Sequence, residues 1–261
     1  MIDLKHTQGF LHHLILEAGD ITLNFRKKRD TLQVNNKAFR DYVTEADVAT
    51  EKFIIEHILR EFPDHSIYGE EAGKIAGNEY RWIIDPIDGT TSFMRGLPFY
   101  SISIALECSG TTILGAVLQP ACNDLYEAVE NGPATLNGSP IHVSQQDNLA
   151  ECVLATGFAC QPLEKGSPNL PFFNRVMPEI QDVRRLGSAA ADCCYVASGC
   201  IEGHWELNLK LYDIAAGAFI VERAGGVVTD FSGGTSGLPG QFICTNGKIH
   251  ESLREILNRP E

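Results

Sequence analysis

The chain has 261 residues, of which 44% are hydrophobic and 21% are charged. This length and composition are typical of a folded globular protein with a large core, and they exclude a disordered or low-complexity chain. The net charge of −13 repels the phosphates of nucleic acids and anionic membrane surfaces, so we expect neither as a partner.

Eight cysteines are spread along the chain without the spacing of a zinc site or a Cys-x-x-Cys motif. The sequence contains no secretory leader and no apolar run long enough to cross a membrane. Since an unpaired cysteine behaves as a small core hydrophobe, we expect buried, reduced thiols and a cytoplasmic protein.

Two amphipathic helices are predicted in the first part of the chain. Apolar residues recur at the helical period over residues 7–28. The second helix is expected to begin at Thr44 and to end at Pro63, because residues 44–47 (Thr-Glu-Ala-Asp) have the form of a capping box.

The region that follows is predicted to be rich in strands. A short strand is expected over residues 66–69, and the apolar run 81–84 predicts a buried strand that stops at Asp85. Several β-rich runs lie between residues 100 and 129. Asn137-Gly138 is typical of a tight hairpin turn.

The polar stretch 145–150 is the predicted boundary between two closely packed halves, residues 1–146 and 147–261. In the second half, strand-like and helix-like segments alternate, which indicates layered α/β packing. The expected strands are 152–155, 182–186, 201–208, 227–230 and 242–245, and the expected helices are 170–180, 188–198, 214–224 and one at the C-terminus.

The run Asp85-Pro86-Ile87-Asp88-Gly89-Thr90 is the centre of the predicted chemistry. Its two carboxylates, with a proline fixing the backbone between them, can converge from a turn onto one hard cation. Gly89 allows close approach of a ligand, and Thr90 lies at an expected helix start, where phosphate binds readily. An Asp-x-x-Asp turn by itself is typical of a solvated loop, and the full six-residue string after a buried strand is far more selective.

Three further acids are ambiguous when each is considered alone. Glu70 fits a surface loop, and Asp213 fits the acid that is favoured at a helix N-terminus. Glu206 ends a strand-like stretch. These acids therefore become informative only in combination.

Five separated motifs agree with one known family. They are Val43-Thr44-Glu45-Ala46-Asp47, Gly69-Glu70-Glu71, the run from Trp82 to Thr91, Leu186-Gly187-Ser188-Ala189-Ala190, and Tyr212-Asp213-Ile214-Ala215-Ala216-Gly217. In their order and spacing they resemble the inositol monophosphatase family of lithium-sensitive, magnesium-dependent sugar phosphatases. The resemblance covers residues 7–258 and implies an α/β fold with five layers, α/β/α/β/α, usually built as a homodimer.

The resemblance also implies which residues hold two to three Mg²⁺ ions. Glu70, Asp85 and the backbone carbonyl of Ile87 would hold a first ion, and Asp85, Asp88 and Asp213 a second. A third, weaker ion would lie near Glu70. In such a site the cations activate a water for in-line attack on the phosphate, and no phosphoenzyme is required.

Further roles follow from the same resemblance. Glu70 and Thr90, with Asp47 behind Thr90, would orient the attacking water. Because carboxylates accept hydrogen bonds from hydroxyl groups, the leaving alcohol is expected to be rich in hydroxyls. The implied substrate contacts are Asp88, Gly89, Thr90, Gly187, Ser188, Ala189 and Glu206.

The chain departs from the common family pattern beside the site, at Met94-Arg95 and at Lys210-Leu211-Tyr212. Arg95 and Lys210 are expected near the mouth, where they would meet an anionic group of the substrate. Lys37 lies in a polar run where the family has a mobile loop near the metals, and a solvated loop lysine fits this position equally well.

The expected function is hydrolysis of a small phosphorylated metabolite, with inositol-1-monophosphatase as the leading activity. Histidinol-phosphatase and fructose-1,6-bisphosphatase are alternatives that share the metal motifs. A non-catalytic, metal-dependent regulatory binding protein is an alternative of a different class. Such a protein would be expected to have lost a metal ligand, whereas all four acids are present here.

Overall fold

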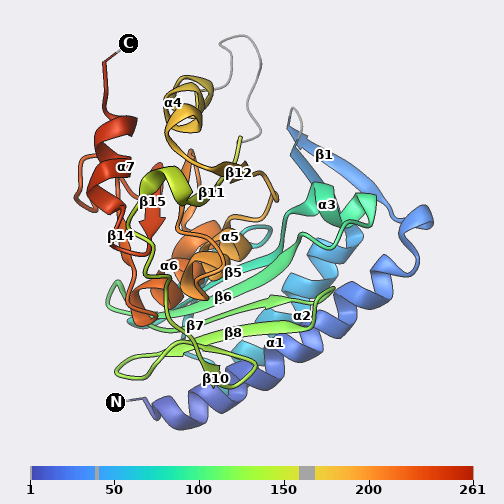
Figure 1. The fold of residues 1–261 in the computed structure, drawn as a ribbon. Coiled ribbons are helices and arrows are strands. Elements are labelled where there is room, and N and C mark those ends of the chain that lie inside the picture. Colours follow the sequence, from blue (N-terminus) through green and yellow to red (C-terminus); the bar gives the residue numbers. More distant parts are fainter. Residues whose placement is uncertain (1, 39–40, 159–167, 261) are drawn as a thin grey trace.

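The computed structural model describes residues 2–38, 41–158 and 168–260 (Figure 1). Two helices, an eight-stranded sheet, two further helices, a five-stranded sheet and two outer helices are stacked in that order. The expected five-layer α/β fold is therefore confirmed. No helix in the described ranges is both long and apolar enough to span a membrane.

The first layer consists of α1 (Leu4–Arg26) and α2 (Glu45–Glu61), which lie side by side on one face of the larger sheet (Figure 1). The predicted capping box is present, because Thr44 Oγ1 accepts from the Ala46 N–H at 3.1 Å and the Thr44 N–H donates to Asp47 Oδ2 at 2.9 Å. Both helices bury one apolar stripe against the sheet, contributed by Leu11, Leu14, Ile15, Ile54 and Ile58.

The larger sheet is antiparallel except where β3 pairs in parallel with β5. Strand β5 lies inside the sheet with helices on both faces, which explains its continuous apolar run. In spatial order the strands are β10 (Ser139–Pro140), β9 (Thr135–Leu136), β8 (Asp124–Val129), β7 (Thr111–Gln119), β6 (Ser101–Cys108), β5 (Tyr80–Asp88), β3 (Ser66–Gly69) and β4 (Gly73–Ile75).

Strand β5 does not stop at Asp85, so the predicted end of this strand is wrong. Pairing with β6 continues to Asp88, which lies opposite Ser101, and the register shifts between Asp85 and Asp88. The irregularity accommodates Pro86, which has no N–H to donate to the ladder. Directly after it, α3 (Thr90–Arg95) begins as expected.

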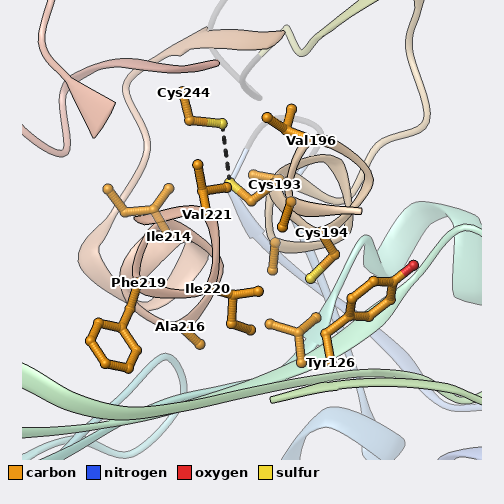
Figure 2. Packing of buried hydrophobic residues seen from close by; sticks show 14 of the residues in the cluster. Tyr126, Cys193, Cys194, Val196, Ile214, Ala216, Phe219, Ile220, Val221 and Cys244 are labelled. Atoms are coloured by element: carbon orange, nitrogen blue, oxygen red, sulfur yellow. Dashed lines mark hydrogen bonds between the residues drawn. The ribbon is translucent and has the colours of Figure 1, made fainter. Parts of the chain in front are cut away.

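The central layer consists of α5 (Ala189–Ala197) and α6 (Leu211–Arg223), which contact each other and both sheets. Figure 2 shows their apolar side chains interlocked with Cys193, Cys194 and Tyr126. Cys193 Sγ lies 3.8 Å from Cys244 Sγ, and burial raises the pKa of the Cys193 thiol well above its usual value.

The seven described cysteines are unpaired, as expected for reduced thiols. The expectation that all of them are buried is wrong, because Cys122 and Cys200 are exposed.

The smaller sheet mixes parallel and antiparallel pairs. On its outer face lie α4 (Leu170–Val176), which continues into a short 3₁₀ turn, and α7 (His250–Leu257). In spatial order the strands are β12 (Asp182–Arg184), β11 (Val153–Thr156), β13 (Gly203–Leu207), β15 (Gln241–Thr245) and β14 (Val227–Thr229).

The sequence patterns missed the hairpin of β1 (Val34–Ala38) and β2 (Asp41–Thr44), and also β4. These strands are short and lack an alternating apolar pattern. The division into residues 1–146 and 147–261 stays a prediction. Helices α5 and α6, which belong to the second range, pack against the sheets of both ranges.

Candidate active site

A cavity of about 450 Å³ opens where β5, α5, β13 and α6 meet. Five of the predicted residues that line it come from these elements and from the end of β3: Glu70, Asp88, Ala189, Glu206 and Asp213. Larger hollows of about 480 and 580 Å³ lie beside α1 and beside α6, but none of these five side chains lines them. The acids single out the 450 Å³ cavity as the candidate site.

Asp85 lies beneath the cavity and is 2% exposed. Its Oδ1 accepts from the Ile87 N–H at 3.0 Å, which holds the carboxylate within its own turn. Burial raises its pKa well above the usual value, and the charges of Glu70, Asp88 and Asp213 raise it further. The four acids therefore share one region of space, as their predicted common role requires.

Asp88 joins the end of β5 to the start of α5. Its Oδ2 accepts from Ser188 Oγ at 2.7 Å and from the Ala190 N–H at 2.8 Å. Burial raises the pKa of Asp88 to about 6. Ser188 is 1% exposed and contacts Ser101 Oγ at 2.9 Å, so its hydroxyl supports Asp88 from behind and does not line the cavity.

Thr90 and Asp47 lie together, as the family pattern implied. Thr90 Oγ1 is 3.3 Å from Asp47 Oδ1 and 3.1 Å from the Ile87 carbonyl oxygen. Burial raises the pKa of Asp47 to about 6. This hydroxyl is thus placed between a carboxylate and the backbone of the acidic turn.

Asp213 lies in the first turn of α6, where its Oδ2 accepts from the Lys210 N–H at 2.6 Å. Burial raises its pKa well above the usual value, with Asp88 and Glu70 as further causes. The helix begins at Leu211, three residues before the predicted range 214–224. This earlier start puts Asp213 inside the helix end, aimed at the cavity.

Glu51, which the sequence patterns did not single out, holds the loop that carries Glu70. Its carboxylate accepts from the Glu71 N–H at 3.0 Å and from the Ala72 N–H at 2.6 Å. A Cβ on Gly69 would lie 2.2 Å from Glu51 Oε1, so any side chain there would displace the Glu51 carboxylate. The only available signal was a glutamate inside the apolar stripe of α2.

Two glycines clear space for the site. Gly89 has φ = +93°, and a Cβ there would lie 2.9 Å from the carbonyl oxygens of Gly187 and Phe99. A Cβ on Gly157 would lie 2.0 Å from Glu206 Oε1. Any side chain at these two positions would displace the Asp88–Thr90 turn or the Glu206 carboxylate.

Basic side chains also border the acids. Arg185 and Lys210 line the cavity, and Arg185 lowers the pKa values of Asp88 and Glu206. Arg185 was not predicted. Arg95 lines a separate hollow of about 380 Å³ beside α3, so the expectation that it lies at this mouth is wrong. The side chain of Lys37 lies outside the described residues.

The donor set suits a hard divalent cation, which prefers carboxylate and carbonyl oxygens. Within the described ranges, no three His, Cys, Asp or Glu side chains are already gathered at metal-binding spacing. Glu70, Asp85, Asp88 and Asp213 nevertheless lie close enough to raise the pKa of Asp85 together. They fit such an ion once side-chain rotation brings their oxygens closer.

The model of the inositol monophosphatase family matches residues 3–259. The chain belongs to this family. Members depend on a metal, typically Mg²⁺, and act on small phosphorylated substrates. The acids around the cavity are thus found in a protein whose family requires a cation.

Individual relatives agree over nearly the whole chain. The chain is 41% identical to "Nus factor SuhB" of Pasteurella multocida over 93% of this chain and 91% of the relative. It is 39% identical to "Inositol-1-monophosphatase" of Rhizobium meliloti over 88% and 87%. The crystal structure of the SuhB protein of Bartonella henselae superposes with a TM-score of 0.92 at 34% identity, covering 98% of this chain and all of that one (100%).

Proposed function

We propose that the protein is a Mg²⁺-dependent phosphomonoester hydrolase that releases phosphate from inositol monophosphate. The observation that carries the proposal is the position of Glu70, Asp85, Asp88 and Asp213 around one cavity beside the N-terminus of α3. Carboxylates that repel one another in this way need cations to hold them together, and bound cations in turn attract phosphate.

The cation ligands are proposed as the family pattern implied. Glu70, Asp85 and the Ile87 carbonyl form one set, and Asp85, Asp88 and Asp213 form the other. When bound, Mg²⁺ supplies charge neutralisation of the phosphate and activation of the attacking water.

The protein groups around the cations position the reactants. Thr90 Oγ1 lies between Asp47 and the Ile87 carbonyl, so its hydroxyl hydrogen has two acceptors and its lone pairs remain available to orient a water. Glu70 faces the same cavity and is the proposed proton acceptor. The backbone N–H groups of Gly89 and Thr90 are the proposed phosphate donors.

The leaving alcohol is assigned to the wall formed by Asp88, Ala189 and Glu206, with Gly187 beside it. Carboxylates on that wall accept hydrogen bonds from hydroxyl groups, which suits a polyol such as inositol. Ser188 enters this scheme as the residue that positions Asp88, because its hydroxyl donates to that carboxylate.

Arg185 and Lys210 favour a second candidate within the same chemistry, a substrate with an additional anionic group such as fructose 1,6-bisphosphate. Histidinol phosphate, whose alcohol carries an amine, would instead be disfavoured, because the positive side chains of Arg185 and Lys210 would repel the protonated amine. The ratio of kcat/KM for inositol 1-phosphate to that for fructose 1,6-bisphosphate separates the candidates.

The relatives named Nus factor SuhB favour a candidate of another class, a regulatory binding protein. The deciding experiment measures phosphate release from the three substrates in Mg²⁺ and in excess chelator, with Asp85→Asn as the inactive control. We expect turnover that needs Mg²⁺, is inhibited by Li⁺ and is lost in the variant. Turnover in chelator, or full activity of Asp85→Asn, would contradict the metal site.

Assembly and location are part of the proposal. We infer a homodimer acting in the cytoplasm, as is usual in the family. Light scattering coupled to size-exclusion chromatography tests the dimer, and a mass of about one chain, 28.6 kDa, would contradict it.

A further inference from the structure

A second set of buried ionisable groups lies directly beneath the cavity. His204 on β13 is 0% exposed, Asp192 on α5 is 1% exposed, and Glu206, which lines the cavity, is 8% exposed. His204 Nδ1 lies 3.8 Å from Asp192 Oδ2, and His204 Nε2 lies 3.6 Å from Glu206 Oε2. The imidazole thus stands between a core carboxyl and a cavity carboxyl.

Three polar atoms of this set have no hydrogen-bond partner in ordinary geometry. Both ring nitrogens of His204 and Oδ1 of Asp192 are buried and unpartnered. Buried polar groups without partners are costly, and small side-chain rotations would close the gaps of 3.6 and 3.8 Å. The carboxyl groups of Asp192 and Glu206 are thus placed to give the two ring nitrogens of His204 their missing partners.

Resting on the proposed function, we propose that His204 is a positioning residue, which donates its Nε2–H to Glu206 and accepts at Nδ1 from a protonated Asp192. The chain Asp192–His204–Glu206 then fixes the Glu206 carboxylate toward the hydroxyl groups of the leaving alcohol. A neutral imidazole has one donor and one acceptor, and this assignment uses both.

The surroundings favour this distribution of protons. Burial lowers the pKa of His204 to about 4, so the ring is neutral, although a weak hydrogen bond from the ring to the backbone of Ala155 opposes this shift. Burial also raises the pKa of Asp192 well above its usual value, and the nearby carboxylates of Glu206 and Asp88 raise it further while Arg185 lowers it. A protonated Asp192 needs an acceptor, and His204 Nδ1 lies 3.8 Å from its Oδ2.

A hydrogen bond donated by His204 would favour the ionised form of Glu206. Burial and the charge of Asp88 raise its pKa to about 8, and Arg185 lowers it. An N–H donated to the carboxylate favours the ionised form. The Gly157 backbone packs against the same carboxylate, which restricts the directions from which another donor could approach.

The tautomer can be tested without turnover. Long-range ¹H–¹⁵N correlation spectra of the labelled full chain, with His204 assigned by its loss in His204→Gln, should show the Nε2–H tautomer unchanged between about pH 6 and about pH 8. An Nδ1–H tautomer or a charged ring in that range would overturn the proposal. Because this measurement needs no substrate, it stays decisive even if the proposed phosphatase activity fails.

Matched variants test the positioning. Asp192→Asn keeps a donor to Nδ1, so we expect KM for inositol 1-phosphate within about twofold of wild type, whereas Asp192→Leu should raise KM about tenfold with kcat nearly unchanged. Likewise, His204→Phe should raise KM about tenfold, and His204→Gln should recover most of the loss. Equal KM values for Asp192→Asn and Asp192→Leu, or a wild-type KM for His204→Phe, would overturn the proposal.

Discussion

The first turns of α2 and α6 contain the same local arrangement and use it differently. In both, an acid at the third helical position accepts a backbone N–H from the residue before the helix: Asp47 from Thr44 at 2.9 Å and Asp213 from Lys210 at 2.6 Å. At α2 the Thr44 hydroxyl completes a capping box. At α6 a lysine stands before the helix and has no side-chain acceptor, so only half of the box exists.

The two caps differ in the surroundings of the second carboxylate oxygen, the one that does not accept from the backbone. Asp47 is 1% exposed, and its other oxygen meets the Thr90 hydroxyl. Asp213 lines the cavity, and the charges of Asp88 and Glu70 raise its pKa. The same cap therefore supports an internal hydrogen bond in one helix and presents the proposed cation ligand in the other.

Asp213→Asn should produce the largest effect. The amide oxygen still accepts from Lys210, so the cap survives, but the cavity loses a negative charge that the proposed cation needs. We expect kcat/KM to fall by about a thousandfold. Steady-state phosphate release measures this, and circular dichroism checks the fold. A loss below about tenfold would mean that Asp213 is no cation ligand.

Mg²⁺ should stabilise the folded protein by about 2–3 kcal/mol at a hundredfold excess over its Kd. The carboxyls of Asp47 and Asp88 have pKa values raised to about 6, so their contribution to stability is full below the unfolded value of 3.8 and is lost as the pH rises through about 6. Above that pH the ionised acids repel, and Mg²⁺ relieves this repulsion.

Thermal unfolding at about pH 5 and about pH 8 measures this effect. The rise in melting temperature with Mg²⁺ should be larger at the higher pH, because protonated carboxyls bind cations poorly. Asp213→Asn should lose most of the rise, and Asp47→Asn should keep it. A rise that is equal at both pH values would contradict a site built from these acids.

Asp47→Asn should lower kcat by about tenfold with little change in KM, because the amide removes the charge that orients the Thr90 hydroxyl while the capping oxygen remains. Steady-state kinetics separate kcat from KM. If this variant lost as much activity as Asp213→Asn, the two acids would have the same role in catalysis, and the proposed difference between the caps of α2 and α6 would be wrong.

Thr44→Ala should have the smallest effect and act on stability. Loss of the capping hydroxyl should lower the free energy of unfolding by about 1 kcal/mol, measured by urea denaturation. The Thr44 N–H still donates to Asp47, so kcat/KM should stay within about threefold of wild type. A collapse of activity would show that the hydroxyl, rather than the backbone, holds Asp47 in place.

Much of the site was predictable because its signals are local. The Asp85–Thr90 run combines two acids, a proline and a glycine within one turn, and the capping box at Thr44 spans four residues. Local signals failed at the end of β5, where an irregularity in pairing with β6 carries the strand past Pro86 to Asp88. They failed again at Arg95, which lies near the acidic turn in sequence but lines another hollow.

Other residues gave no local signal, because their partners lie far away in sequence. Glu51 accepts from Glu71 and Ala72, and it appeared only as an acid in an apolar stripe. Arg185 borders the acids across the cavity, and His204 meets Asp192 and Glu206 beneath it. Their roles depend on how the strands and helices pack.

From the sequence alone, periodicity and caps predict layered α/β packing, and the resemblance carried by five short motifs implies the five-layer fold, the family and the candidate acids, because these signals are properties of neighbouring residues. The tertiary structure alone decided which of the two capping acids faces the cavity and which residues support the acids from behind. Burial and the approach of distant charges set these outcomes, because both arise only when separate elements are packed together.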